Sequence, residues 1–208
     1  VFYDRLDPHV GLLKLIPGME DELAAFMLER YDGLIIESFG VGGVPYYDND
    51  EFTEKIMIPE LLEASLIKDA NDRTPEWFAT LASVVRPRTK HLGDVAGICS
   101  MVFDSAETLP YEEKAVSKGL AKEGMTAILD AAIKALEGVS PDSWNAEAVD
   151  AALEQLPDQL DAKKRIVFQA IRAAICGNLV SPPLGVVIEL VGKADALARL
   201  ERAKSMAL

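Results

Sequence analysis

The sequence is poor in cysteine and histidine, with two of each among its 208 residues. Cys99 and Cys176 stand far apart and belong to no CxxC pair or Cys/His cluster. A structural zinc site needs about four such ligands at short paired spacings, so the sequence excludes this kind of metal site. One disulfide stays open, but two buried free thiols are the better expectation for a cytoplasmic chain.

Long apolar runs are also missing. The stretch 184–190 is interrupted by Glu189 and falls far short of the ~20 apolar residues that cross a bilayer. Asp4, Arg5 and Asp7 break up the first ten residues, so we expect no secretory signal. Half of the residues are apolar, which is enough for a globular core. We therefore expect a cytoplasmic protein that does not bind membranes.

Positive charge is scarce overall, because the formal net charge is −13. Nucleic-acid binding depends on cationic contacts to phosphate, so this total argues against it. Residues 1–54 hold 3 basic and 12 acidic side chains, a balance of −9, whereas residues 55–208 hold 18 and 22, a balance of −4. The acidity is concentrated in the first piece, and basic patches in the second piece can still attract phosphate.

The first piece, residues 1–54, predicts a strand, a helix and a second strand. An apolar run from Val10 to Ile16 ends at a Pro-Gly turn, and apolar residues recur at helical spacing between Glu20 and Tyr31. Leu34 to Ile36 with Phe39 forms the next apolar run. A crossover of this length predicts two parallel strands, a βαβ unit.

A glycine-rich loop follows the second predicted strand, with Gly40, Gly42 and Gly43. Ligands of parallel sheets bind beyond the carboxyl ends of the strands, so these glycines are a possible ligand loop. No Gly-Lys-Ser/Thr follows them, which excludes a Walker phosphate loop. From glycine content alone, a structural turn is the favoured interpretation.

Two spaced motifs of this first piece carry a family resemblance. Residues 13–18 (LKLIPG) and 31–45 (YDGLIIESFGVGGVP) resemble the C-terminal domain of bacterial L-asparaginases of the cytosolic type. The resemblance implies that the Gly40–Pro45 loop completes the active site of a neighbouring subunit. It also implies that the threonine nucleophiles lie on another domain, so residues 1–54 alone should not hydrolyse amides.

The second piece, residues 55–208, has helical periodicity almost throughout. Met125, Ile128, Leu129, Ala132, Ile133 and Leu136 form one apolar stripe. Shorter stripes run through Val149, Ala152, Leu153 and Leu156, and through Ile166, Ile171, Ala174 and Ile175. Thr74, Ser181 and Asn145 are predicted helix N-caps. The fold class that we expect is mostly α: an all-helical bundle or superhelix of about seven to nine helices, preceded by the small βαβ segment.

Two segments of the second piece differ from plain core. Residues 86–91 (RPRTKH) place Arg86, Arg88, Lys90 and His91 at a proline break; they suit an RNA loop or, slightly better on composition alone, a helix end stabilised by cations. Residues 172–184 contain the irregular connection NLVSPPL. Its backbone groups, a Ser hydroxyl and a helix N-terminus could contact a splayed nucleotide, and a capped loop between helices is the alternative.

Together these segments carry a second resemblance. A set of ordered motifs resembles the anticodon-binding region of bacterial glutamate–tRNA ligases over about residues 56–208. The motifs are 77–78 (WF), 86–88 (RPR), 92–95 (LGDV), 101–103 (MVF), 172–184 (RAAICGNLVSPPL), 189–193 (ELVGK) and 199–200 (RL). The resemblance implies that Arg88 reads the last anticodon base. It also implies anticodon contacts from Arg172, Ser181 and Leu184, with Arg86 beside them. Gly185 and Val186 depart from the family pattern, in which a bulkier residue and Glu follow.

The motifs by which such ligases bind ATP and Mg²⁺ do not occur in the sequence, so we expect no cofactor and no catalytic residue in this chain. The leading hypothesis is recognition of the tRNA(Glu) anticodon. The alternative is an asparaginase fragment that completes a partner's site, with residues 1–54 forming a homo-oligomer or an asparaginase-like assembly. A third hypothesis is that the join near Thr53–Ile58 is not one natural gene.

Overall fold

The computed structural model describes residues 9–14, 21–37, 49–91 and 93–207. Contacts divide the chain into two units, 1–48 and 49–208. The boundary precedes the sequence seam near Thr53, because Phe52 and Met57 are buried with the helices that follow (5% and 0% exposed). Among the described residues, none of the helices has the length and apolar character needed to cross a membrane.

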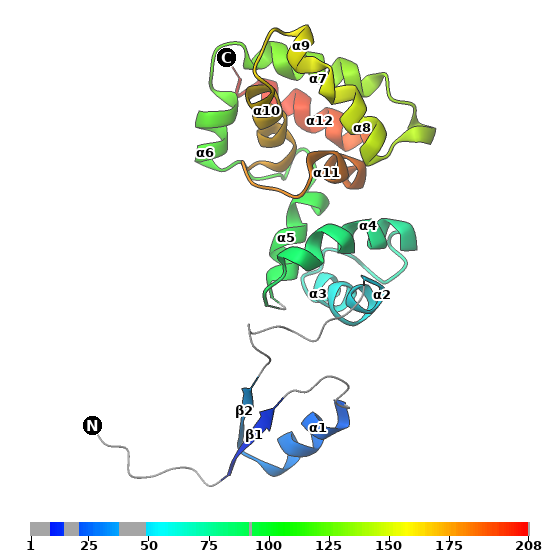
Figure 1. Ribbon diagram of the computed structural model, residues 1–208, viewed down its shortest axis with the longest axis vertical. Helices are drawn as coiled ribbons and strands as arrows, with labels where there is room; N and C mark the ends of the chain where they lie inside the picture. The colour runs from blue at the N-terminus through cyan, green and yellow to red at the C-terminus, as the bar shows by residue number, and fades with distance from the viewer. Residues whose placement is uncertain (1–8, 15–20, 38–48, 92, 208) are drawn as a thin grey trace, which may run out of the picture. The chain divides into compact units, whose positions relative to one another are not determined.

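The first unit is the βαβ unit that its sequence predicts (Figure 1). The strands pair in parallel, with Val10 opposite Gly33 and Lys14 opposite Glu37. Gly11 allows the helix to lie close to the sheet, since an added Cβ would lie 3.0 Å from Cε of Met27 on the helix. The elements of the unit are β1 (Val10–Lys14), α1 (Asp21–Arg30) and β2 (Gly33–Glu37).

The second unit is helical, which confirms the predicted fold class (Figure 1). Its first group of helices runs from α2 to α5. The elements of this group are α2 (Asn49–Phe52), the π-helix η1 (Thr53–Met57), α3 (Ile58–Glu63), α4 (Pro75–Val85), the 3₁₀ turn η2 (Arg86–Arg88) and α5 (Asp94–Phe103).

A larger group of helices completes the second unit. Short helices of three or four residues make its elements more numerous than the sequence predicts. They are α6 (Glu113–Ala115), the π-helix η3 (Val116–Leu120), α7 (Met125–Glu137), the 3₁₀ turn η4 (Pro141–Ser143), α8 (Ala146–Glu154), α9 (Leu156–Gln159), α10 (Lys164–Cys176), α11 (Leu184–Val191) and α12 (Lys193–Lys204).

The main core lies among α7, α8, α10, α11 and α12. Every member of the predicted stripe from Met125 to Leu136 is buried there. On α10 the prediction is correct for Ile171, Ala174 and Ile175 but wrong for Ile166, which is 37% exposed. The buried stripe begins one residue later, at Val167, so Ile166 lies on the flank of the helix.

Two of the three predicted N-caps are confirmed and the third is wrong. Thr74 accepts a hydrogen bond from the Trp77 amide (3.3 Å), and Asn145 accepts one from Ala148 (2.9 Å), so both caps are confirmed. Ser181 does not cap α11: its hydroxyl donates to the Pro182 carbonyl (2.8 Å), and the cap residue is Pro183. The backbone of α11 therefore begins two residues later than the sequence predicts.

Candidate nucleic-acid interface

The first predicted RNA segment lies at the end of α4. After Val85 the chain tightens into η2, and the Thr89 amide donates to the Val85 carbonyl (3.0 Å). Arg88 is exposed, and its Nη1 donates to the Val84 carbonyl at 2.7 Å. The guanidinium therefore stabilises the helix C-terminus, as the helix-end interpretation predicts. A guanidinium has five N–H donors, so this bond leaves others for a ligand.

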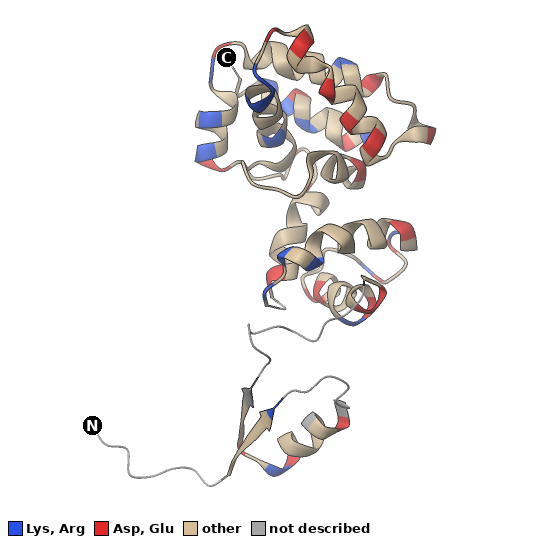
Figure 2. Ribbon diagram, viewed as in Figure 1, with Lys and Arg blue, Asp and Glu red and all other residues tan. Residues whose placement is uncertain are grey.

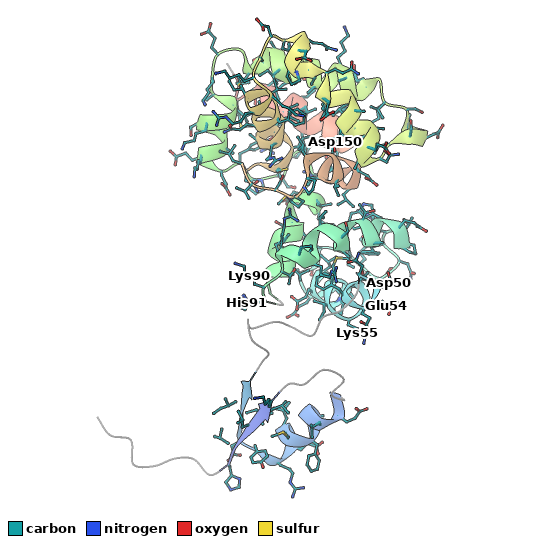
Figure 3. All side chains as sticks on the ribbon, viewed as in Figure 1. Asp50, Glu54, Lys55, Lys90, His91 and Asp150 are labelled. Atoms are coloured by element: carbon teal, nitrogen blue, oxygen red, sulfur yellow. The ribbon has the colours of Figure 1, made fainter. Side chains whose placement is uncertain are left out.

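The turn after η2 is fixed by one carboxylate. The backbone amides of Lys90 and His91 donate to Asp94 Oδ2 (3.1 and 2.9 Å). These two bonds, that from His91 first, lower the pKa of the Asp94 carboxyl and keep it charged at the start of α5. The Lys90 and His91 side chains are exposed and project from this turn (Figure 3).

The second predicted segment begins in α10 and centres on Cys176. Burial raises the pKa of the Cys176 thiol, while a hydrogen bond with Ser181 and the charge of Arg172 act in the opposite direction. Arg172, on α10, and Ser181, in the loop that follows, thus both act on the pKa of the same thiol. Arg172 is half-buried and makes no hydrogen bond or ion pair within the part of the chain that the structure describes.

The loop after Cys176 exposes backbone and one apolar side chain. Asn178 Oδ1 accepts from the Val180 amide at 3.1 Å, and the Val180 side chain is 82% exposed. Leu184, the first residue of α11, is buried at 4% exposure. A base could therefore meet Ser181 and the loop backbone directly, whereas the Leu184 side chain anchors the start of α11.

Asp150 of α8 takes the place at the start of α11 that the sequence assigns to Ser181 (Figure 3). A Cβ on Gly185 would lie 2.5 Å from Asp150 Oδ1, so only glycine admits this carboxylate. Burial and then repulsion from Glu154 raise the Asp150 pKa, and hydrogen bonding from the Gly185 amide opposes that rise. Glu189 of α11 in turn accepts from the Ala146 amide of α8 (2.8 Å).

The segment between α5 and α6 braces the end of α10. The Tyr111 hydroxyl donates to the Ala174 carbonyl, and the Glu112 amide donates to the Gly177 carbonyl, both at 2.8 Å. Gly177 has a φ of +67°, and a Cβ there would lie 2.0 Å from the Pro110 carbonyl oxygen. A pocket of about 340 Å³ opens beside this contact, lined among others by Met101, Tyr111, Cys176 and Asn178.

Arg199 is a central residue of this region to which the sequence analysis assigned no role. Its fully buried guanidinium donates to the carbonyls of Met101 and Ile175 (2.8 Å each) and to that of Asp104. Its Nε donates to Asp195 Oδ2 at 2.8 Å. The sequence signals were the place of Arg199 in the resemblance to glutamate–tRNA ligases and the Asp195–Arg199 spacing of four on a helix, which is also that of an ordinary surface pair.

The two predicted base-reading sets lie on different helices. Arg86 and Arg88 follow α4, whereas Arg172, Ser181 and Leu184 belong to α10, its loop and α11. The first turn of α4 contacts α11, since Trp77 Nε1 donates to the Leu190 carbonyl at 3.0 Å. The predicted ligand loop at Gly40, Gly42 and Gly43 lies outside the described residues.

Comparison with known proteins identifies mainly the second unit of the chain. A family model described as an anticodon binding domain matches residues 51–204. A glutamate–tRNA ligase of Corynebacterium diphtheriae is 42% identical over 136 residues, which cover 65% of this chain and 27% of the relative. That of Corynebacterium efficiens is 33% identical over 177 residues, 85% and 35%. The chain thus spans about a third or less of the length of these relatives.

Solved structures support the fold. A glutamate–tRNA ligase from Elizabethkingia meningosepticum, in complex with its amino acid, superposes with a TM-score of 0.60 at 16% identity, over 76% of this chain and 31% of that one. The 177-residue match is longer than residues 49–208, so it takes in part of the first unit. Nothing in these comparisons supports the asparaginase resemblance of residues 1–54 or an asparaginase-like partner.

Proposed function

The chain belongs to the anticodon-binding domain family of glutamate–tRNA ligases, and from that premise we propose that it binds tRNA(Glu) by its anticodon. In this proposal the helical unit is the recognition part of a ligase. Activation of glutamate, with ATP and Mg²⁺, belongs to a part of such enzymes that this chain does not match. The residues proposed to meet the anticodon are Arg86, Arg88, Arg172, Ser181 and Leu184.

The observation that carries the proposal is the exposed guanidinium of Arg88 on a rigid helix end. Its Nη1 is held by the Val84 carbonyl (2.7 Å), which fixes where the remaining donors point. A guanidinium fixed in this way can present two parallel N–H groups to a base edge. A well-formed contact of this kind contributes about 1–3 kcal/mol of discrimination between bases.

The second segment supplies contacts of a different kind. Arg172 offers a charge without a hydrogen-bond or ion-pair partner in the described structure, and Ser181, in the loop after α10, offers a hydroxyl. The exposed Val180 side chain can pack against the face of an unstacked base. We assign Leu184 a supporting role, since its buried side chain fixes the helix start and leaves only backbone for RNA.

Binding of tRNA(Glu) and of the same tRNA with single anticodon changes tests this function. We expect the chain to prefer the matched anticodon. Arg88→Ala should weaken matched binding by about 10-fold and erase discrimination at one position, which corresponds to the ~1–3 kcal/mol of one base contact. Arg88→Lys should retain affinity better than discrimination, because Lys keeps the charge and loses the fork.

The matched control is Arg73→Ala, which removes an exposed arginine that pairs with Asp72 (3.3 Å). It should leave discrimination unchanged. Because Arg88 also caps α4, thermal unfolding of each variant must show a folded protein at the assay temperature. Equal affinity of the unaltered chain for matched and anticodon-changed tRNA would contradict the proposed function.

A further inference from the structure

Five cations lie on α6, η3, the turn that follows and the neighbouring α10 of the larger helical group. Lys114, Lys118 and Lys122 recur every four residues along α6, η3 and the turn that follows, and all three are exposed. Arg165 is exposed and Arg172 half-buried on the neighbouring α10. Figure 2 shows these basic positions along α6 and α10. We call these five residues the basic band.

Packing makes the band continuous. A Cβ on Gly119 would lie 2.6 Å from the Ala173 side chain and 3.5 Å from the Gln169 carbonyl oxygen, so η3 lies directly against α10. The same point is 3.3 Å from Leu179 Cδ2, in the loop that carries Ser181. The band therefore runs from the lysines of α6 and η3 to the loop proposed to meet the anticodon.

The band is not neutralised within the protein. None of its five residues makes a hydrogen bond or an ion pair among the described residues. Elsewhere Lys55 pairs with Glu51 (3.3 Å), Lys164 with Glu154 (3.0 Å) and Lys204 with Asp130 (2.7 Å). In a chain of net charge −13, five neighbouring cations without a carboxylate partner are a local reversal of sign.

Acidic side chains lie beside and away from the band. Glu112, Glu113 and Glu123 are its neighbours in the chain and reduce its net charge without pairing with it. Other acids of this helical group lie on α8 and α9, and one of them, Glu154, pairs with Lys164, the residue before Arg165 (3.0 Å); they are Glu147, Asp150, Glu154 and Asp158 (Figure 2). A polyanion approaching this helical group is attracted at the band and repelled at α8 and α9.

We propose that the basic band binds the phosphate backbone of the tRNA beside the anticodon. This inference rests on the proposed function and adds to it a contact that carries no sequence information. Phosphate contacts of this kind set the register of a nucleic acid, while base contacts elsewhere specify it. The lysines would hold the backbone, and Arg172 would lie where the band meets the base-reading loop.

The test is a combined variant, Lys114→Gln, Lys118→Gln and Lys122→Gln, in the full chain. Its matched control is Lys55→Gln, Lys68→Gln and Lys134→Gln, which removes the same three charges from exposed positions outside the band. Affinity for matched and anticodon-changed tRNA is measured from 50 to 200 mM KCl at fixed Mg²⁺. Each lost contact to single-stranded phosphate should lower the slope of log affinity against log salt by about 0.7.

We expect the band variant to lower the slope of log affinity against log salt by about 2. Its loss of tRNA affinity relative to the unaltered chain should therefore be about 20-fold smaller at 200 mM than at 50 mM KCl. Both tRNAs should weaken equally, which leaves the discrimination ratio unchanged. If the band variant and the control variant had equal slopes, the proposed contact between the basic band and phosphate would be wrong. The discrimination ratio of the unaltered chain tests the proposed function separately, so either can fail while the other holds.

Discussion

Replacing Arg199 with methionine should be among the most damaging single changes in the helical unit. The side chain is fully buried, and its donors satisfy the carbonyls of Met101, Asp104 and Ile175 together with the Asp195 carboxylate. Methionine fills much of the volume but donates nothing. Removing one partner of a buried ion pair costs about 3–5 kcal/mol. The melting temperature of a domain of this size should then fall by about 10 °C.

Urea unfolding of the full chain, followed by circular dichroism at 222 nm, measures this loss. Arg172→Met is the matched control, because Arg172 makes no hydrogen bond or ion pair in the described structure and should cost no more than about 0.5 kcal/mol. A local readout is hydrogen exchange at the Ala106 amide, which donates to Asp195 Oδ1 at 2.8 Å and should open faster. If Arg199→Met were no more costly than Arg172→Met, the assigned role of the buried guanidinium would be wrong.

Two further predictions concern the same region. Gly177→Ala should destabilise by at least about 3 kcal/mol, because it adds the clash with the Pro110 carbonyl to the ~1 kcal/mol of strain that a positive φ imposes. Gly124→Ala has a similar φ of +83° with open space around it and should show the strain alone; equal losses in urea unfolding would contradict this. Burial raises the pKa of Cys99 to about 12 from an ordinary 9.0, so the native state keeps a proton that the unfolded state loses. The free energy of unfolding should therefore fall as pH rises above about 9, and Cys99→Ala should flatten that dependence in unfolding experiments at pH 8 to 10.5.

Periodicity and local chemistry correctly predicted the structural features that depend on residues close together in the chain. The stripe from Met125 to Leu136 is buried as its spacing requires, and Thr74 and Asn145 cap their helices through amides three residues away. The parallel pairing of β1 and β2 followed from the length of the crossover. Each of these features is decided within about a dozen residues, where pattern is a sufficient guide.

The features that the sequence did not predict depend on residues that are far apart in the chain. Ser181 looked like a cap by the same rule as Thr74, but Asp150 comes from α8 to the start of α11 and the Ser181 hydroxyl bonds to Pro182 instead. The hydrogen bonds of Arg199 to Met101 and Asp104 span 98 and 95 residues. Partners so distant in the chain are set by the packing of whole helices, which no local pattern encodes.

The structure tests the helix-end interpretation of the candidate site, while its contacts to RNA stay a prediction. Arg88 lies at the end of α4, where its Nη1 caps the helix, and the rest of the exposed guanidinium is left for the predicted base contact. Arg172 and Ser181, nine residues apart in the chain, both act on the pKa of the Cys176 thiol, and Gly177 lies between them with a φ of +67°. The resemblance named these residues, but the close approach to Pro110 that holds them was not visible in the sequence.

The hydrogen bonds of the free protein also rank the proposed contacts. Ser181 already donates to Pro182 at 2.8 Å, so an RNA acceptor must replace a bond before it adds one, and the net gain of such an exchange is small. Arg172 has no bond to give up within the described structure. Its charge, which is part of the basic band, can act on phosphate at a distance, whereas recognition of a base edge needs direct contact. The guanidinium of Arg172 should therefore contribute more to affinity than the Ser181 hydroxyl, and that of Arg88, held in place by Val84, more to specificity.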